Sequence, residues 1–165
     1  MLDFFNPGCF AIFGEEGWFM LSNLLLVCVG NLCRSPMAEG FFAEKTAKLG
    51  NFSVNSAGLR AVVGESAVSK AQEVMCGIGV DITKHRAKQL TCDMIKEANL
   101  ILVMEKWHKK EIESMMPTAR GKVYLLGQWG NFEVPDPYTK PTEAFEQCLQ
   151  LIEKAWQDWY SRIIQ

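Results

Sequence analysis

The sequence is poor in the residues that build metal sites and in the long apolar runs that build membrane helices. It has two histidines, and its six cysteines form no CxxC pair and no zinc-like cluster with them. We therefore predict no metal and no cofactor. No apolar run approaches the roughly 20 residues of a transmembrane helix, so no stable membrane insertion is expected. No secretory signal is expected either, because the first residues carry no Lys or Arg and no uninterrupted apolar stretch.

An excess of positive charge is absent as well. The formal net charge is −2 at pH 7, whereas nucleic-acid binding needs a clustered basic face, so no nucleic-acid partner is predicted. The GxxxxGK[ST] pattern of nucleotide-binding loops does not occur. A chain of 165 residues suits a single domain. Its cysteine pattern is typical of free thiols in a reducing compartment, which predicts a cytoplasmic location.

The stretch 24–39 organises the rest of the chain. It opens with a continuous apolar run, as in a strand that is buried on both faces. Gly30 and Asn31 follow, and both residue types tolerate a positive φ. Ser35 and Pro36 then suit the N-cap and the first position of a helix. A loop of this kind directs N–H groups and the helix dipole at one point, so it predicts an anion-binding site.

Cys28 lies at the start of this loop and Arg34 at its end, with five residues between them. Convergent N–H groups and a guanidinium favour the thiolate form of a cysteine. The planar guanidinium also binds two phosphoryl oxygens at once. A nucleophile at the base of a phosphate-binding loop indicates covalent phosphoryl transfer to sulfur. Cys28 as an ordinary buried core cysteine is the alternative, but a core thiol needs no arginine beside it.

The ten residues 27–36, VCVGNLCRSP, resemble the signature loop of the low-molecular-weight protein tyrosine phosphatases. Much later in the chain, Asp136-Pro137-Tyr138 resembles the general-acid loop of the same family. The similarity runs from about Leu24 to the C-terminus and is strongest to the bacterial branch. Some members of that branch act with tyrosine kinases that control exopolysaccharide export. The resemblance therefore implies a phosphotyrosine-containing protein as partner, with a bacterial tyrosine kinase as the candidate.

The resemblance also implies roles for individual residues. Cys28 would be the nucleophile, Arg34 the phosphate-binding cation and Asp136 the general acid. The phosphate-binding loop would comprise Val29, Gly30, Asn31, Leu32, Cys33, Arg34 and Ser35. Supporting hydrogen bonds would come from Asn31, Ser35, Ser56 and His85. The opposing walls of the substrate pocket would be Tyr138 and Leu59, although some members carry an aromatic residue at the latter position.

Some of these residues have an alternative explanation. Asp136 is flanked by two prolines and could be an ordinary turn residue. His85 could be a surface histidine. The other histidine, His108, precedes two lysines, and we expect it to be exposed and inert.

Cys33 gives the loop a second thiol. Because the loop curls around one anion, its two ends should lie close in space. We therefore predict that peroxide joins Cys28 and Cys33 in a reversible disulfide, which would trap the sulfenic acid before further oxidation. Simple packing of Cys33 against the sheet is the alternative.

Strand and helix patterns alternate along the chain. Strands are predicted at 24–29, 52–56, 100–104 and 123–126, and helices at 35–49, 66–78, 91–98, 107–116 and 141–163. Such alternation favours right-handed βαβ units and a parallel sheet covered on both faces. We predict an α/β fold: one three-layer domain with a four-stranded parallel sheet flanked by helices, and the phosphate-binding loop after its first strand. The resemblance implies the same four-stranded sheet.

Residues 1–19 stand apart from this pattern. They contain five Phe and one Trp but no Lys or Arg. Met20 resembles the usual start of the family, so we interpret 1–19 as an N-terminal extension of unknown role or an artefact of the assigned start. The phosphatase domain would then be 20–165. A membrane-touching aromatic arm is the alternative, which the missing basic residues disfavour.

Taken together, these features predict a cytoplasmic protein-tyrosine phosphatase that works through a phosphocysteine intermediate. Arsenate reductases of the thioredoxin-coupled kind share the fold and a similar loop, but they need two further cysteines a few residues apart. Cys76 and Cys92 are sixteen positions apart. A phosphate-binding module without turnover is the other alternative, and it would be expected to lack Cys28 or Asp136.

Overall fold

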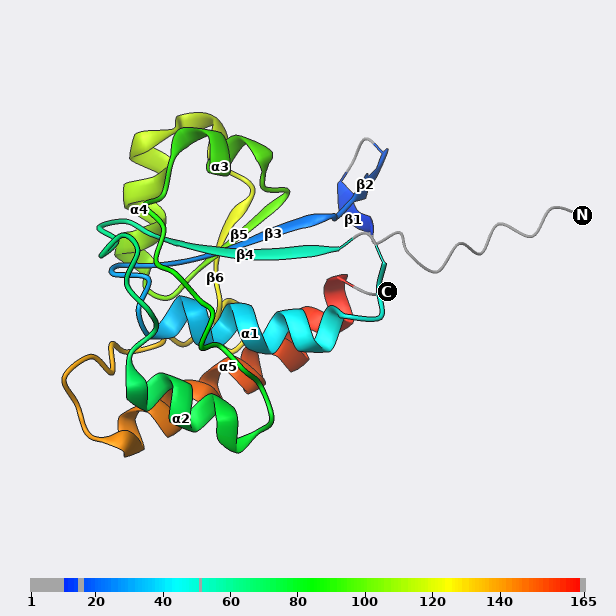
Figure 1. The fold of residues 1–165 in the computed structure, drawn as a ribbon. Helices are drawn as coiled ribbons and strands as arrows, with labels where there is room; N and C mark the ends of the chain where they lie inside the picture. The colour runs from blue at the N-terminus through cyan, green and yellow to red at the C-terminus, as the bar shows by residue number, and fades with distance from the viewer. Residues whose placement is uncertain (1–10, 15–16, 51, 164–165) are drawn as a thin grey trace, which may run out of the picture.

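The computed structural model describes residues 11–14, 17–50 and 52–163. Its central sheet has four parallel strands in the order β4-β3-β5-β6. The strands are β3 (Asn23–Cys28), β4 (Ser53–Gly58), β5 (Leu100–Val103) and β6 (Val123–Leu125). Helices cover both faces of this sheet (Figure 1). The predicted three-layer α/β fold with a four-stranded parallel sheet is confirmed.

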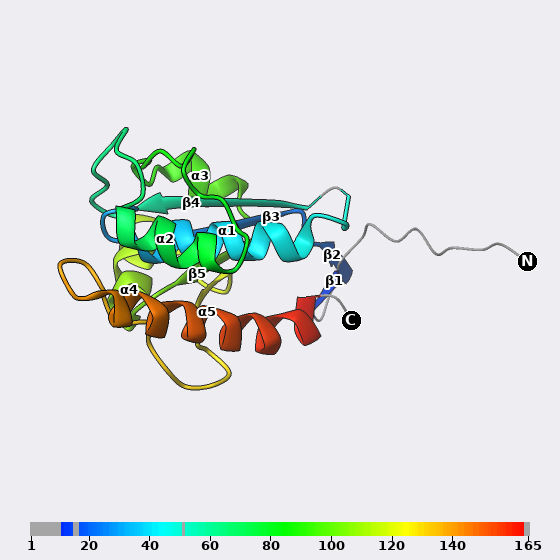
Figure 2. The same cartoon turned by 60° about the horizontal axis from the view of Figure 1, so that its bottom comes forward.

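Two groups of helices form the outer layers. On one face lie α1 (Arg34–Thr46), α2 (Ser69–Gly77) and α5 (Thr142–Ile163), and on the other lie α3 (Cys92–Glu97) and α4 (Lys106–Met115) (Figures 1 and 2). A short 3-10 turn (Pro117–Ala119) follows α4. None of the described helices is long and apolar enough to span a bilayer.

The central strand β3 divides its side chains between the two layers. Leu24, Leu26 and Cys28 join the core cluster beneath α1, α2 and α5, whereas Leu25 and Val27 join the cluster beneath α3 and α4. This alternation follows from the two-residue period of a strand. It explains why the run is apolar throughout, and it directs Cys28 toward the N-terminus of α1.

The boundaries of the first two helices differ from the predicted ones. The second helix begins at Ser69 rather than at 66, because the Val68 N–H donates to the Leu32 carbonyl at 3.0 Å and ties this segment to the loop. The first helix ends at Thr46, four residues before Gly50, which adopts φ +65°. Thr91 caps α3 as predicted, since its hydroxyl accepts from the Met94 N–H.

The part of residues 1–19 that the structure describes contributes to a hairpin. Its strands β1 (Ala11–Gly14) and β2 (Gly17–Met20) pair antiparallel. The hairpin lies at the amino end of β3, far from the loop edge of the sheet and near the C-terminal end of α5 (Figures 1 and 2). Residues 1–10 and 15–16 of the proposed extension lie outside the described residues, and its role stays a prediction.

Candidate active site

Residues 29–33 form the loop between β3 and α1, at the carboxyl edge of the sheet (Figure 1). Asn31 adopts φ +56°, the left-handed conformation for which asparagine is suited. Gly30 does not adopt a positive φ, so the tight step of the loop is made by Asn31 rather than by both residues. The backbone conformation of the loop therefore depends on Asn31.

The Cys28 side chain is buried at the carboxyl end of β3. Its sulfur lies 2.9 Å from the hydroxyl of Ser35. The prediction that Ser35 is the helix N-cap was wrong, because the helix begins two residues earlier, with Cys33 at the N-cap and no side-chain cap. Ser35 is thus a residue of the first helical turn, and its hydroxyl contacts the thiol instead of capping the backbone.

The Asn31 side chain connects the loop to its surroundings. It is fully buried, and its Nδ2 donates to the hydroxyls of Ser35 and Ser56, each at 2.8 Å. Its Oδ1 accepts from the Lys88 N–H at 2.8 Å. Three separate segments therefore fix the one left-handed residue of the loop, which gives the loop a single shape before any anion arrives.

A second layer of contacts supports this network. The Ser56 hydroxyl donates to Glu39 at 2.5 Å, and His85 Nε2 lies 2.9 Å from the Asn31 carbonyl. His85 Nδ1 is 3.6 Å from Glu39, and its side chain is 7% exposed, so the surface interpretation of His85 is wrong. Burial alone would raise the pKa of Glu39, but hydrogen bonds from His85 and Ser56 hold it below its ordinary value. Glu39, which lies one helical turn after Ser35, was not predicted from the sequence.

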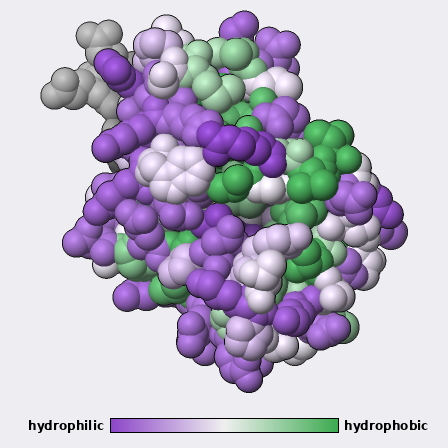
Figure 3. Space-filling view, turned by 90° about the vertical axis from the view of Figure 1, so that its left-hand side faces the viewer, coloured by the Kyte–Doolittle hydropathy of each residue, from purple (hydrophilic) through white to green (hydrophobic). Residues whose placement is uncertain are grey.

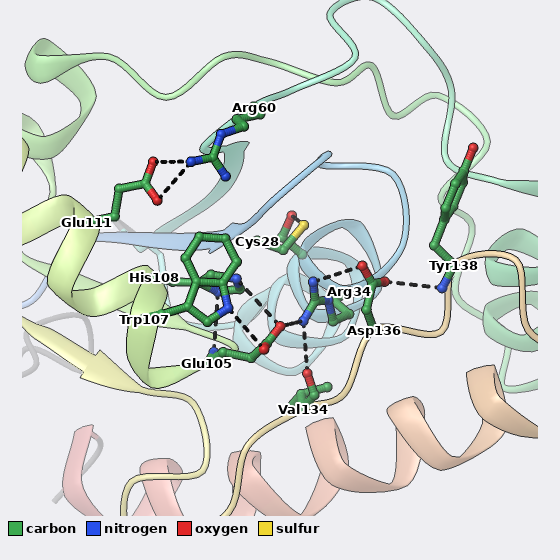
Figure 4. Close-up of polar contacts among 11 residues, drawn as sticks. Cys28, Arg34, Arg60, Glu105, Trp107, His108, Glu111, Val134, Asp136 and Tyr138 are labelled. Atoms are coloured by element: carbon green, nitrogen blue, oxygen red, sulfur yellow. Dashed lines mark hydrogen bonds and ion pairs between the residues drawn. The ribbon is translucent and has the colours of Figure 1, made fainter.

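Arg34 is the first residue of α1 and is 2% exposed despite its charge. A buried charge needs partners. Its Nη1 donates to the Glu105 carboxylate and to the Val134 carbonyl, the latter at 3.0 Å. Its Nη2 lies 3.2 Å from the Asp136 carboxylate (Figure 4). Two segments that are distant in the sequence therefore hold the guanidinium at the end of the loop.

Glu105 is a partner of Arg34 that was not predicted from the sequence. It follows β5 and is the N-cap residue of α4, and its second oxygen accepts from Trp107 Nε1 at 3.1 Å. Partial burial alone would raise the pKa of Glu105, but the hydrogen bond and charge of Arg34 outweigh it and hold the pKa below its ordinary value. The available signal was position, because a carboxylate after a buried parallel strand lies at the same edge of the sheet as Cys28.

The prediction that His108 is exposed and inert was wrong. The side chain is fully buried, because it lies in the first turn of α4 and folds back onto the N-cap residue. Its Nδ1 accepts from the Glu105 N–H at 3.3 Å, and its Nε2 is 3.6 Å from the Glu105 carboxylate. Burial, together with the positive charge of Arg34, lowers the pKa of His108 from 6.5 to about 4. The imidazole is therefore neutral at pH 7.

Asp136 lies in the segment between β6 and α5. One of its oxygens accepts from the Tyr138 N–H at 3.1 Å, the local turn contact that its flanking prolines suggest. The other oxygen faces Arg34, and the side chain is 51% exposed. The segment is anchored by the Val134 N–H, which donates to the Met104 carbonyl at 2.9 Å. Asp136 is thus both a turn residue and a carboxylate directed at the loop.

A pocket of about 260 Å³ opens above the loop. It is lined by Cys28, Val29, Gly30, Leu32, Cys33, Arg34, Arg60, Val62, Asp136 and Tyr138. The edge of the molecule that carries the loop presents hydrophobic and hydrophilic surface side by side (Figure 3). The pocket therefore combines a charged floor with a partly apolar wall.

The prediction for Leu59 as a pocket wall was wrong. Its N–H donates to the Cys28 carbonyl at 2.9 Å, so the strand-like alternation of β4 continues through this residue. Leu59 therefore shares a face with Ala57 and is buried in the core cluster beneath α3 and α4. Arg60 and Val62 alternate with Leu59 and so lie on the opposite face, where they line the pocket. Tyr138 also lines it.

The remaining thiols near the site are held protonated. Burial, followed by the negative charge of Asp136, raises the pKa of Cys33 to about 12. Burial likewise raises the pKa of Cys148 to about 12. Cys76 and Cys92 are exposed, in α2 and at the start of α3. Among the described residues no group of three His, Cys, Asp or Glu side chains could hold a metal ion.

Comparison with known proteins agrees with this geometry. The family model "Low molecular weight phosphotyrosine protein phosphatase" matches residues 23–165. The probable low molecular weight protein-tyrosine-phosphatase EpsP of Ralstonia nicotianae is 43% identical over 144 residues, which cover 87% of this chain and 97% of that protein.

Solved structures show the same likeness. The crystal structure of the Erwinia amylovora tyrosine phosphatase AmsI has a TM-score of 0.84 and 39% identity, over 93% of this chain and 99% of that one. The YwlE arginine phosphatase from Geobacillus stearothermophilus has a TM-score of 0.75 and 31% identity, over 85% and 94%. The chain described here belongs to the low molecular weight phosphotyrosine protein phosphatase family.

Proposed function

We propose that the protein hydrolyses phosphotyrosine in protein substrates through a phosphocysteine formed on Cys28. One observation carries the proposal: the Cys28 thiol and the buried Arg34 guanidinium, at the two ends of one loop, share a pocket with the Asp136 carboxylate of a distant segment. Nucleophile, cation and acid are the three groups that covalent phosphoryl transfer requires. The free thiols among the described residues favour the cytoplasm as its location.

In the first step the Cys28 sulfur attacks phosphorus, and the bond between phosphorus and the tyrosyl oxygen breaks. Arg34 and the loop N–H groups bind the equatorial oxygens, where charge builds up in the transition state. Asp136 transfers its proton to the leaving phenolate. In the second step Asp136, now a carboxylate, takes a proton from water, which attacks phosphorus and releases phosphate and the Cys28 thiolate.

The pairing of Arg34 with Asp136 suggests how the acid becomes available. Glu105 and the Val134 carbonyl hold Nη1 of Arg34, and Nη2 faces Asp136. A phosphoryl dianion would compete with Asp136 for Nη2, since it is the stronger acceptor.

The wall of the pocket favours an aromatic phosphate ester. Leu32 and Val62 offer apolar contacts and Tyr138 offers a ring for stacking on the substrate. The phosphate of phosphotyrosine also stands farther from the backbone than that of phosphoserine, which suits a recessed thiol. From the resemblance to the bacterial branch we infer that a tyrosine kinase of polysaccharide export is a candidate substrate.

The two alternative functions find less support. An arsenate reductase would need a pair of relay cysteines, whereas Cys76 and Cys92 lie on different helices. A module without turnover would have no use for Asp136 in the pocket beside Arg34. Neither alternative explains a carboxylate directed at the position of a leaving group.

A turnover assay tests the proposal. Phosphotyrosine, phosphoserine and phosphoarginine peptides and arsenate with thioredoxin would be compared at equal concentration, and Cys28→Ser is the matched control. We expect phosphotyrosine to be hydrolysed fastest and Cys28→Ser to be inactive while still binding vanadate through the loop. Faster turnover of phosphoarginine or arsenate, or retained hydrolysis by Cys28→Ser, would contradict the proposal.

A further inference from the structure

Arg60 is the exposed cation of the pocket. It follows β4 by two residues, and its N–H donates to the Val29 carbonyl at 2.9 Å, which fixes its backbone to the phosphate-binding loop. Its side chain lines the pocket and is 64% exposed, whereas the other lining cation, Arg34, is buried. Arg60 therefore lies at the rim of the pocket and Arg34 at its floor.

Side chains of α4 hold this guanidinium in place. Arg60 Nη2 donates to both oxygens of Glu111, at 3.1 and 3.3 Å (Figure 4). The guanidinium also lies 5.7 Å from the centre of the Trp107 ring. Among the described residues, the hydrogen-bond partner of the guanidinium is Glu111, and both of these hydrogen bonds come from Nη2. The Nε and Nη1 groups thus remain available to a further acceptor.

The contact with Glu111 can be exchanged or shared. Both side chains are partly exposed, at 64% and 31%, and an exposed ion pair contributes little to stability. The Trp107 ring nevertheless keeps the planar group near the pocket. A planar guanidinium binds carboxylates in two-point geometry.

We propose that Arg60 determines specificity by binding the carboxylate of an Asp or Glu that neighbours the phosphotyrosine of the substrate. The inference rests on the proposed function, because the phosphotyrosine must occupy the pocket for a flanking residue to reach the rim. Arg34 and the loop take the phosphate, so the cation at the rim is left for the flanking chain. Glu111 moderates this preference because it competes for the same guanidinium.

Matched phosphotyrosine peptides test the inference. One peptide carries only Gln around the phosphotyrosine, and the others carry a single Glu at each of the two positions on either side in turn. We expect wild-type protein to prefer at least one Glu peptide by about twofold to fivefold in kcat/KM, the size of an exposed charge pair. The preference should lie in KM and should shrink at high salt.

Three variants separate the contributions. In Arg60→Gln the ratio of kcat/KM for the Glu peptide to kcat/KM for the Gln peptide should fall to one. In Glu111→Gln this ratio should rise above the wild-type value. Arg120→Gln removes an exposed arginine just before β6, at the opposite edge of the sheet, and should keep the wild-type ratio. Each variant's turnover of the Gln peptide is its own reference.

The outcomes are distinct. A wild-type ratio of one at every position, or an unchanged ratio in Arg60→Gln, overturns the inference while leaving the phosphatase activity standing. An equal fall of that ratio in Arg120→Gln would also overturn it, because net charge would then explain the preference. If wild-type protein hydrolyses none of the phosphotyrosine peptides, the proposed function itself fails.

Discussion

The buried imidazole of His108 should make the stability of the protein depend on pH in a defined window. The pKa of His108 is about 4 in the folded protein against 6.5 in its ordinary state. As pH falls, the unfolded chain therefore binds this proton first, and the free energy of unfolding decreases from about pH 6.5 down to about pH 4. At about 1.4 kcal/mol per pH unit, the full loss is about 3 kcal/mol, and about 2 kcal/mol is lost at pH 5.

The structure supplies the physical reason for this loss. A neutral ring that accepts at Nδ1 carries its proton on Nε2, but a protonated ring donates from both nitrogens. Protonation would therefore place an N–H group on Nδ1, where it would face the Glu105 N–H. The hydrogen bond that Nδ1 now accepts from Glu105 would be lost. It would also add a buried positive charge near Arg34.

His108→Gln is the variant that isolates this effect. A glutamine at the third helical position can still accept from the N-cap N–H but does not titrate. Urea unfolding of both proteins at pH 7.5 and pH 5 measures the difference. We expect wild-type protein to lose about 2 kcal/mol more than His108→Gln over this interval. The other histidine, His85, is present in both proteins and cancels. Equal losses in the two proteins would refute the reasoning.

Three further predictions concern the site. Asp136→Ala should lower turnover of phosphotyrosine by about 10²- to 10⁴-fold but that of an aryl phosphate with an acidic phenol much less, and an equal loss across leaving groups would rule out Asp136 as the acid. Glu105→Gln should lower kcat/KM about tenfold, because Arg34 exchanges a charged hydrogen bond for a neutral one, and unchanged kinetics would contradict this. Mild peroxide should join Cys28 to Cys33 in a reversible disulfide, although the high pKa of Cys33 slows its attack on the Cys28 sulfenic acid. Peptide mapping that finds Cys28 as sulfinate and Cys33 free would end this idea.

Much of the fold could be predicted because local and tertiary preferences coincide. The apolar run of β3 is buried on both faces, and Thr91 meets the local requirements of an N-cap. The signature loop is also local, so Cys28 and Arg34 could be assigned from adjacent residues. In each case the residues that determine the structure lie within a few positions of one another.

The misjudged positions depend on contacts between distant segments. The Glu105 side chain turns inward because it meets Arg34, 71 positions earlier in the chain, and no local pattern contains that information. The environment of His108 depends in turn on Glu105. Leu59 was misassigned because the alternation of β4 continues past the last strand residue, which only the pairing with Cys28 reveals.

The contact between Arg34 and Val134 spans 100 positions of the chain. The Val134 N–H donates in turn to the carbonyl of Met104, the residue after β5, so Val134 links the first helix, the end of β5 and the segment before the last helix. Such long-range closures form late in folding, since their loop entropy must be offset by contacts made earlier. We therefore expect catalytic activity to recover during refolding only when the whole domain is complete. A phosphate analogue that binds only the completed site adds to the stability of the native state alone.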